Sequence, residues 1–392
     1  MAENQNIEKD AGRLAVLERI KEYEKKGWWS KDVEEDPPTI PLTPDKVDYL
    51  NKKLSNRFLT WLVNVGAQRF IKNLVKDGKM IIKEIKGIEN YEAVDKEGVV
   101  ITCNHFNPFD NFAIHYALFP YLYDHHRVLY KVIREGNYTN FPGIYGLFFR
   151  HCNTLPLSAN FSTMKKFMEA VKVLLARGEK ILVYAEQGMW WNYRKPRPLT
   201  VGAFKFAAEN KVPVLPMFIT MEDSDKIGPD GFPIQEYTLN IMPAIYPDKE
   251  KTVKENMVLL RDKNYAAWKD CYESFYGIPL VYETEDEAFK SESPASGSEN
   301  SSVAENGSSK AGGSSAMGNE SSKTGDVSVT ENVSGAGSES FKLENGSSKV
   351  GGSSAMGNES SKTGAGSGAQ DGSSKSAGGS SATAESSPSQ EA

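Results

Sequence analysis

Hydrophobic and polar positions along the chain follow two different patterns, and the change falls near residue 79. Before it, residues 7–26 and 43–76 place apolar side chains at helical spacing among many charges, with prolines between 37 and 44 separating them. After it, short apolar runs alternate with amphipathic stretches. The runs predict strands at 80–85, 99–103, 128–132, 181–184, 212–219 and 238–242. The stretches predict helices at 109–119, 140–149, 163–177, 202–209 and 251–276.

This alternation of strands and helices indicates the fold class. Short, continuously apolar strands separated by helices are typical of a mostly parallel sheet that is covered by helices on both faces. We therefore expect an α/β domain at residues 79–284, preceded by an N-terminal amphipathic helical region at residues 1–78.

The second predicted helix carries an unusually wide apolar face. That face is formed by Leu59, Leu62, Val63, Gly66, Phe70 and Leu74. Phe58 and Trp61 flank it, and Arg57, Arg69 and Lys72 lie nearby. A wide apolar face edged by tryptophan and cations is what a helix in a membrane interface needs. The same pattern also suits a helix that packs on the domain core.

Residues 285–392 have a different composition from the rest of the chain. They are rich in Ser and Gly, and Phe289 and Phe341 are their only aromatic residues. Such a segment buries too little apolar surface to offset its ordering entropy, so we expect a disordered tail. The segment at 305–325 recurs at 344–364 with one change, Ala311 to Val350. Neither copy has an apolar face, so we interpret the repeat as duplication of a disordered segment.

Charge and cysteine content limit which binding partners and which cellular compartment we expect for this protein. The tail carries a net charge of −8, which leaves +2 on residues 1–284, so we expect no nucleic-acid partner. The three cysteines show no paired spacing and suit a reducing compartment. No secretory signal opens the chain, and no apolar run reaches the length of a membrane span. We expect a protein that stays in the cytoplasm and is peripheral at most.

The strongest chemical signal is a histidine followed five positions later by an aspartate. The segment NHFNPFD at 104–110 places His105 directly after a buried strand and Asp110 near the first turn of a helix. Open α/β sheets place their sites at this carboxyl edge of the strands. A neutral imidazole can take a proton from a hydroxyl when a carboxylate binds its other nitrogen and stabilises the imidazolium. The alternative is a purely structural histidine at a strand end.

Four segments in order resemble the motifs of the glycerolipid, or lysophospholipid, acyltransferase family. NHFNPFD at 104–110 is similar to the His-x4-Asp motif, and LPLS at 155–158 is similar to the second motif. ILVYAEQG at 181–188 resembles the strand and Glu-Gly turn of the third, and VPVLPM at 212–217 resembles the fourth. The resemblance covers about residues 79–245. It implies that His105 and Asp110 are catalytic and that Glu186 and Gly188 belong to the acceptor-binding turn.

Two arginines that many relatives carry are absent. Ser158 and Ala159 stand where the second motif often ends in Asp-Arg, and Met189 follows the Glu-Gly turn in place of Thr-Arg. Three cations follow that turn instead, namely Arg194, Lys195 and Arg197. Guanidinium groups suit phosphate oxygens, so we expect these cations to hold an acceptor's phosphate. A solvated basic loop is the alternative. Lys131, at the end of a predicted strand, is a further candidate contact.

The resemblance implies a reaction. We expect transfer of a fatty acyl group from acyl-CoA or acyl carrier protein to a lysophospholipid hydroxyl, with 1-acyl-sn-glycerol-3-phosphate as the first choice of acceptor. Such an enzyme in phospholipid biosynthesis would work as a peripheral protein on the cytoplasmic face of a membrane. It would need no cofactor, and the histidines lack metal-ligand spacing. The alternatives are acylation of another lipid acceptor and a non-catalytic membrane-binding scaffold.

Overall fold

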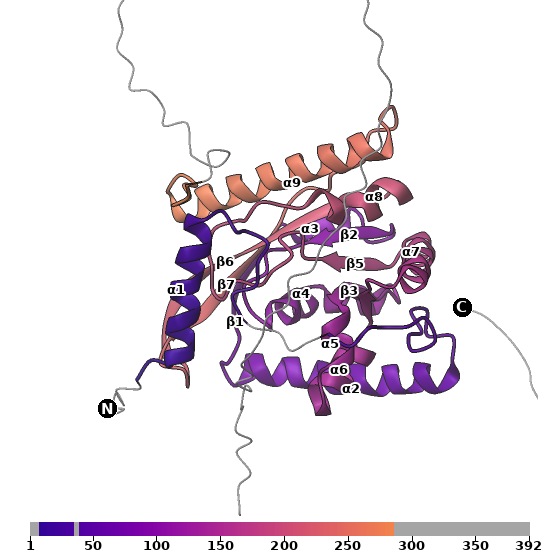
Figure 1. The fold of residues 1–392 in the computed structure, drawn as a ribbon, viewed down its shortest axis with the longest axis horizontal. Coiled ribbons are helices and arrows are strands. Elements are labelled where there is room, and N and C mark those ends of the chain that lie inside the picture. The colour runs from indigo at the N-terminus through magenta and orange to yellow at the C-terminus, as the bar shows by residue number, and fades with distance from the viewer. Residues whose placement is uncertain (1–7, 35–38, 286–392) are drawn as a thin grey trace, which may run out of the picture. The chain divides into compact units, whose positions relative to one another are not determined.

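The computed structural model describes residues 8–34 and 39–285, which all belong to one compact unit (Figure 1). Most of the residues expected to form the tail, 286–392, lie outside the described residues. Two long helices precede the sheet, α1 (Ala11–Lys25) and α2 (Leu54–Lys76). Helix α1 begins where the Asp10 carboxylate accepts a hydrogen bond from the Arg13 backbone N–H at 2.8 Å. Among the described residues, no helix has the length and apolar character needed to cross a membrane.

A seven-stranded mixed sheet, mostly parallel, forms the centre of the domain. Its strands lie in the order β1-β7-β6-β2-β5-β3-β4. Their bounds are β1 (Ile81–Lys86), β2 (Val99–Thr102), β3 (Leu129–Arg134), β4 (Thr154–Leu157), β5 (Lys180–Val183), β6 (Val214–Ile227) and β7 (Pro233–Ile241). Only the β6–β7 pair is antiparallel. The central strands, including β2, are therefore flanked by parallel neighbours, whose carboxyl ends meet at one edge.

Helices cover both faces of the sheet, as expected for the α/β class (Figure 1). On one face lie α7 (Phe161–Ala176), α8 (Lys205–Asn210) and α9 (Val253–Tyr276), and on the other α2, α3 (Ile88–Glu92) and α4 (Asp110–Asp124). Strand β2 shows the alternation directly, because Val100 packs on the first face whereas Val99 and Ile101 pack on the second. The α/β class is thereby confirmed.

Several element boundaries differ from the expected ones. Helix α2 begins at Leu54 and not near residue 43, because the Asp48 carboxylate binds the backbone N–H groups of Lys52 and Lys53 and Asn51 adopts a left-handed conformation (φ 51°). This turn precedes the helix and keeps residues 43–53 outside it. The remaining elements are α5 (Glu135–Thr139), α6 (Gly143–His151) and a 3-10 turn at Val201–Phe204.

The expected apolar face of α2 divides into two parts. Val63 and Leu74 are buried on the domain core, whereas Leu62 is 49% exposed. The exposed apolar side chains occupy the first half of the helix, where Phe58 and Trp61 are 64% and 61% exposed. One side of this helix therefore packs on the core, as the second interpretation expects, whereas the other side faces outward and its membrane contact stays a prediction.

Candidate active site

The turn after β2 is held in place by a buried asparagine. The Asn104 side-chain amide donates to the Ile219 carbonyl at 3.0 Å and its oxygen accepts from the Ile219 N–H at 2.8 Å. The main-chain pairing of β2 with β6 ends at Thr102. The two hydrogen bonds of the Asn104 side chain link the chain to β6 beyond that point. His105 follows immediately, so the imidazole starts from a fixed point at the carboxyl edge of the sheet.

His105 and Asp110 lie in direct contact. The His105 Nδ1 atom is 2.7 Å from Asp110 Oδ2, and Asp110 is fully buried at the first turn of α4. The same carboxylate oxygen accepts from the Phe106 backbone N–H at 3.1 Å. The His105 side chain is 22% exposed, and its Nε2 atom has no hydrogen-bond partner among the described residues. The arrangement leaves one imidazole nitrogen available to an incoming hydroxyl while the other is oriented by a carboxylate.

Tyr184 completes this group, although the sequence reasoning assigned it no role. Its ring stacks on the His105 ring with centroids 4.0 Å apart and planes 18° from parallel. Its hydroxyl donates to Asp110 Oδ1 at 2.5 Å. Burial and the neighbouring carboxylate raise the pKa of Tyr184 well above its usual value, so the phenol stays protonated. Its place at the end of β5, the strand beside β2, was the available signal.

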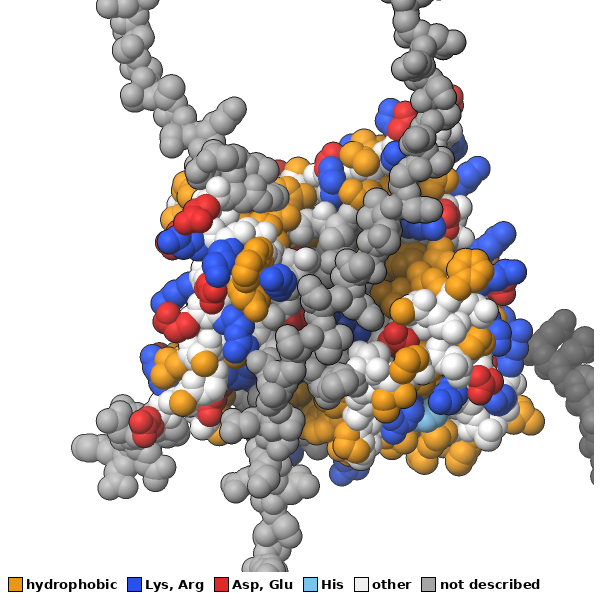
Figure 2. Space-filling model, viewed as in Figure 1, with side chains coloured by type: hydrophobic (Ala, Val, Ile, Leu, Met, Phe, Trp, Pro, Cys, Tyr) orange, Lys and Arg blue, Asp and Glu red, His pale blue; other side chains and the backbone are white. Residues whose placement is uncertain are grey.

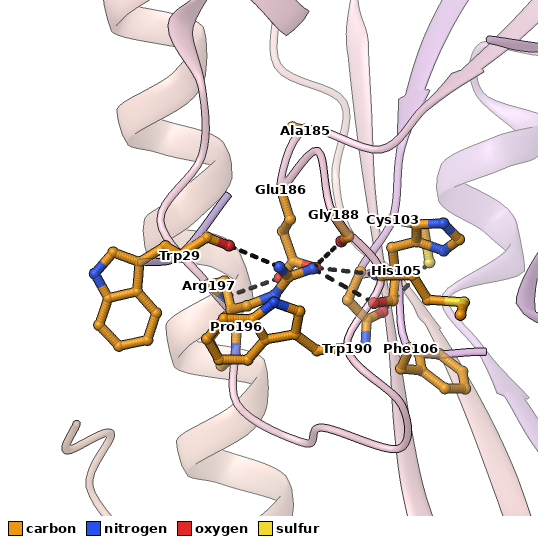
Figure 3. Close-up of polar contacts among 12 residues, drawn as sticks. Trp29, Cys103, His105, Phe106, Ala185, Glu186, Gly188, Trp190, Pro196 and Arg197 are labelled. Carbon is orange, nitrogen blue, oxygen red and sulfur yellow. Dashed lines mark hydrogen bonds and ion pairs between the residues drawn. The ribbon is translucent and has the colours of Figure 1, made fainter. Parts of the chain in front are cut away.

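Glu186 and Arg197 form a buried ion pair behind His105. Glu186 Oε2 lies 2.9 Å from Arg197 Nη2 and also accepts from the His105 backbone N–H at 3.0 Å. Figure 3 shows the Arg197 guanidinium reaching the carbonyls of Trp29, Gly188 and His105 as well. Glu186 is 2% exposed and Arg197 is 1% exposed. Their charges thus satisfy each other inside the protein and hold the His105 loop, and the acceptor contacts expected at both residues stay a prediction.

Gly188 lies where another segment of the chain passes close to it. A Cβ atom at this position would lie 2.9 Å from the Lys31 carbonyl oxygen and 3.0 Å from Asp32 Oδ1. The indole of Trp190 donates to the same Lys31 carbonyl at 2.7 Å. The segment around Lys31 therefore covers the turn that was expected to contact the acceptor, and glycine is needed there for close packing.

The two remaining cations of the loop also have carboxylate partners. Arg194 Nη2 is 2.6 Å from Asp223, and Lys195 Nζ is 2.7 Å from Glu24. The Arg194 side chain is 40% exposed and that of Lys195 is 25% exposed. The structure thus does not bring Arg194, Lys195 and Arg197 together around one open anion site.

Lys131 lies in a different environment from these cations. It occupies the middle of β3, level with Leu182 of β5, and not the end of a strand as the sequence suggested. Its ammonium donates to the Cys152 carbonyl at 3.2 Å and has no carboxylate within ion-pair distance among the described residues. Burial lowers the pKa of Lys131.

No group of three or more His, Cys, Asp or Glu side chains is placed to hold a metal ion anywhere in residues 8–34 and 39–285. The Cys103 thiol lies next to the site, and burial together with the Asp110 charge raises its pKa, so it is a neutral packing group.

The comparison with protein-family models agrees with the motifs. Residues 83–220 match the family model described as Acyltransferase. One similar solved structure is the crystal structure of the 1-acyl-sn-glycerophosphate (LPA) acyltransferase PlsC from Thermotoga maritima. It shares 17% sequence identity with a TM-score of 0.39, covering 59% of this chain and 86% of that chain. No curated protein matches the chain.

Proposed function

We propose that this chain, whose residues 83–220 form a domain of the acyltransferase family, moves a fatty acyl group from a thioester donor to the free hydroxyl of a lysophospholipid. The observation that carries the proposal is the 2.7 Å contact between His105 Nδ1 and the buried Asp110 carboxylate. That contact fixes the tautomer in which Nε2 is the basic atom. The acyltransferase family model matches this range, and the acceptor and donor are our inference.

The reaction follows from these two residues. His105 Nε2 takes the proton of the acceptor hydroxyl as its oxygen attacks the thioester carbonyl carbon. The resulting tetrahedral oxyanion collapses with cleavage of the carbon–sulfur bond, and the leaving thiolate recovers the proton from the imidazolium. Asp110 stabilises the imidazolium between the two steps and keeps the ring in place. No covalent acyl-enzyme and no cofactor are needed, because acyl-CoA or acyl carrier protein supplies the activated acyl group.

The acceptor that best suits the site carries a phosphate, with 1-acyl-sn-glycerol-3-phosphate as our first choice. Lys131 supports this assignment because it is buried without a carboxylate partner. Arg194 and Lys195 are the competing candidates, since both are partly exposed, but each already has an ion-pair partner. Arg197 is enclosed and acts through the His105 loop.

The outward side of α2 supports peripheral attachment to a membrane, which we place on its cytoplasmic face. Phe58, Trp61 and Val65 are 64%, 61% and 53% exposed, and Ile144 of the neighbouring α6 is 61% exposed. Figure 2 shows apolar side chains gathered along the lower edge, where Figure 1 places α2 and α6. Exposed aromatic and aliphatic side chains of this size gain free energy when they enter the interfacial region of a bilayer.

Product analysis by mass spectrometry tests the proposed function. Purified protein is incubated with acyl-CoA or acyl carrier protein thioester and a panel of acceptors: lysophosphatidate, lysophosphatidylcholine, an aminolipid and monoacylglycerol. We expect a diacylated phospholipid whose formation depends on His105, with His105→Ala at least about a hundredfold slower. If only an acceptor other than lysophosphatidate were acylated, that lipid would take its place as the assigned acceptor. Absence of product with every pair, in a folded protein that binds vesicles, would instead support a non-catalytic membrane-binding scaffold.

A further inference from the structure

We propose that Tyr184 is a positioning residue that lowers the basicity of His105 by sharing the Asp110 carboxylate with it. The inference rests on the proposed function only in making His105 the base. The contacts themselves belong to the described structure. Tyr184 does not reach the reacting atoms, so it acts through Asp110.

The geometry places both rings on one carboxylate. His105 Nδ1 binds Asp110 Oδ2 at 2.7 Å, and the Tyr184 hydroxyl binds Asp110 Oδ1 at 2.5 Å. The two rings stack at 4.0 Å between centroids, so they approach the carboxylate side by side. Among the described residues Oδ1 has no other hydrogen-bond donor, whereas Oδ2 also accepts from the Phe106 backbone. Tyr184 is therefore the one side chain that satisfies this oxygen.

Two donors on one carboxylate compete for its negative charge. A short hydrogen bond from a phenol stabilises the carboxylate, and less of its charge then remains to stabilise an imidazolium on the other oxygen. Without the phenol, the buried Oδ1 atom loses its partner, and the histidine–aspartate pair takes up a proton more readily.

The other ionisable groups around His105 and Asp110 do not compete for the charge of the Asp110 carboxylate. Cys103, directly after β2, and Tyr237 of β7 both lie close enough to feel the Asp110 charge, and burial raises the pKa of both, so they stay neutral. Glu186, beside the His105 backbone, is neutralised by Arg197 at 2.9 Å. Tyr237 packs edge-on against Phe106 and makes no hydrogen bond to Asp110 within the described residues. It is thus a matched control, a buried phenol near the same carboxylate but not bonded to it.

The first measurement is the pH profile of kcat/KM for acyl transfer. Tyr184→Phe keeps the ring and removes the hydroxyl, and we expect the acidic limb of its profile to move up by roughly half a pH unit to one unit. Tyr237→Phe should keep the wild-type limb. Replacement of Tyr184 by 3-fluorotyrosine, whose phenol is a stronger donor, should move the limb in the opposite direction. Profiles that coincide for the wild type and both Tyr184 variants would overturn the inference.

The second measurement needs no substrate. An NMR titration follows the imidazole C–H signals of the five histidines, and the His105 signal is assigned by its loss in His105→Gln. The ring of His105 should take up its proton at higher pH in Tyr184→Phe than in the wild type. This shift in a protein without acyl transfer would uphold the role of Tyr184 and reject the proposed function. Acyl transfer with no shift in either measurement would uphold the proposed function and reject the role of Tyr184.

Discussion

Arg197 and Glu186 satisfy each other's charge in the interior of the protein, with 2.9 Å between Nη2 and Oε2. Each also binds the loop that carries His105, since Glu186 accepts from the His105 N–H and Arg197 donates to the His105 carbonyl. The pair therefore links the third motif to the first through main-chain contacts. Arg197, expected from the sequence to contact substrate, therefore supports the loop that carries His105 in this structure.

Removal of Arg197 should destabilise the fold. Arg197→Met leaves the Glu186 carboxylate buried without a cation, and we expect a loss of about 3 to 5 kcal/mol in the free energy of unfolding. Adding Glu186→Gln removes the stranded charge and should recover part of it. Denaturant unfolding measures both, with Arg194→Met as the control, because its exposed pair with Asp223 should contribute about 1 kcal/mol or less. Equal losses for Arg197→Met and Arg194→Met would contradict the assignment.

Asp110→Asn should reduce turnover by at least about a hundredfold. An amide cannot stabilise the imidazolium, and its NH2 group would face donors that Asp110 Oδ2 now accepts from. Steady-state kinetics on Asp110→Asn, His105→Ala and the double variant provide the check. The double variant should be no slower than the slower single variant, because the two residues act as one unit. Losses that multiply in the double variant would indicate independent roles.

Lys131→Met should weaken the binding of a phosphate-bearing acceptor. We expect its Michaelis constant to rise about tenfold or more, since a charge-assisted hydrogen bond is lost, while an uncharged monoacylglycerol is unaffected. Because burial lowers the pKa of Lys131, the ammonium loses its proton at a lower pH than an ordinary lysine, so wild-type acceptor affinity should also fall early on the alkaline side. Arg194→Gln and Lys195→Gln test the competing site. A tenfold effect there, with none at Lys131, would move the phosphate to that loop.

The exposed half of α2 should determine membrane affinity. Phe58→Ser combined with Trp61→Ser removes two side chains that are mostly exposed, so the melting temperature should stay unchanged. Binding to anionic vesicles, followed by sedimentation, should fall at least about tenfold, because each apolar side chain contributes on the order of 1 kcal/mol or more on entering the interface. Val63→Ser, on the buried side, should lower the melting temperature instead. Vesicle binding that survives in the double variant would place the membrane contact elsewhere.

His115 should make the protein acid-sensitive. Burial lowers its pKa to about 3, below the 6.5 of an unfolded histidine, so the unfolded chain binds more protons between these values and stability falls as pH decreases through that window. At pH 5 this group should cost about 2 kcal/mol relative to pH 7. Urea unfolding at both pH values should show a smaller difference in His115→Gln. The exposed His126→Asn serves as control, and an unchanged pH dependence in His115→Gln would refute the assignment.

The sequence predicted the central strands because their apolar runs are continuous. It missed β4, whose short apolar run is interrupted by Pro156. Proline is tolerated there because β4 lies at the edge of the sheet. It also underestimated the lengths of β6 and β7, because their residues nearest the connecting turn do not form an apolar run. The Gly228-Pro229-Asp230-Gly231 segment between them, with Gly231 at φ 75°, was the signal for a hairpin.

At the site, short spacing was more informative than charge. His105 and Asp110 are five residues apart, so one turn and the start of a helix were enough to predict that they meet. The partners of Arg194, Lys195 and Arg197 are Asp223, Glu24 and Glu186, and two of these come from distant parts of the chain. No local pattern reveals such pairing. Tyr184 is different, because its place at the end of a predicted strand indicated the right edge of the sheet, but its contact with Asp110 depends on the register of β5 beside β2.

The position of β7 in the sheet has a consequence for how the chain folds during synthesis. Strand β1 pairs only with β7, with Ile81 opposite Glu236. The first strand to be synthesised therefore has no pairing partner until the last strand has been made. Until then β1 is an unpaired strand next to the apolar side chains of α2. Long-range pairing of this kind slows folding and prolongs exposure of aggregation-prone surface. A chaperone, or the membrane that α2 is proposed to bind, would be most useful to this protein before residue 241 has been translated.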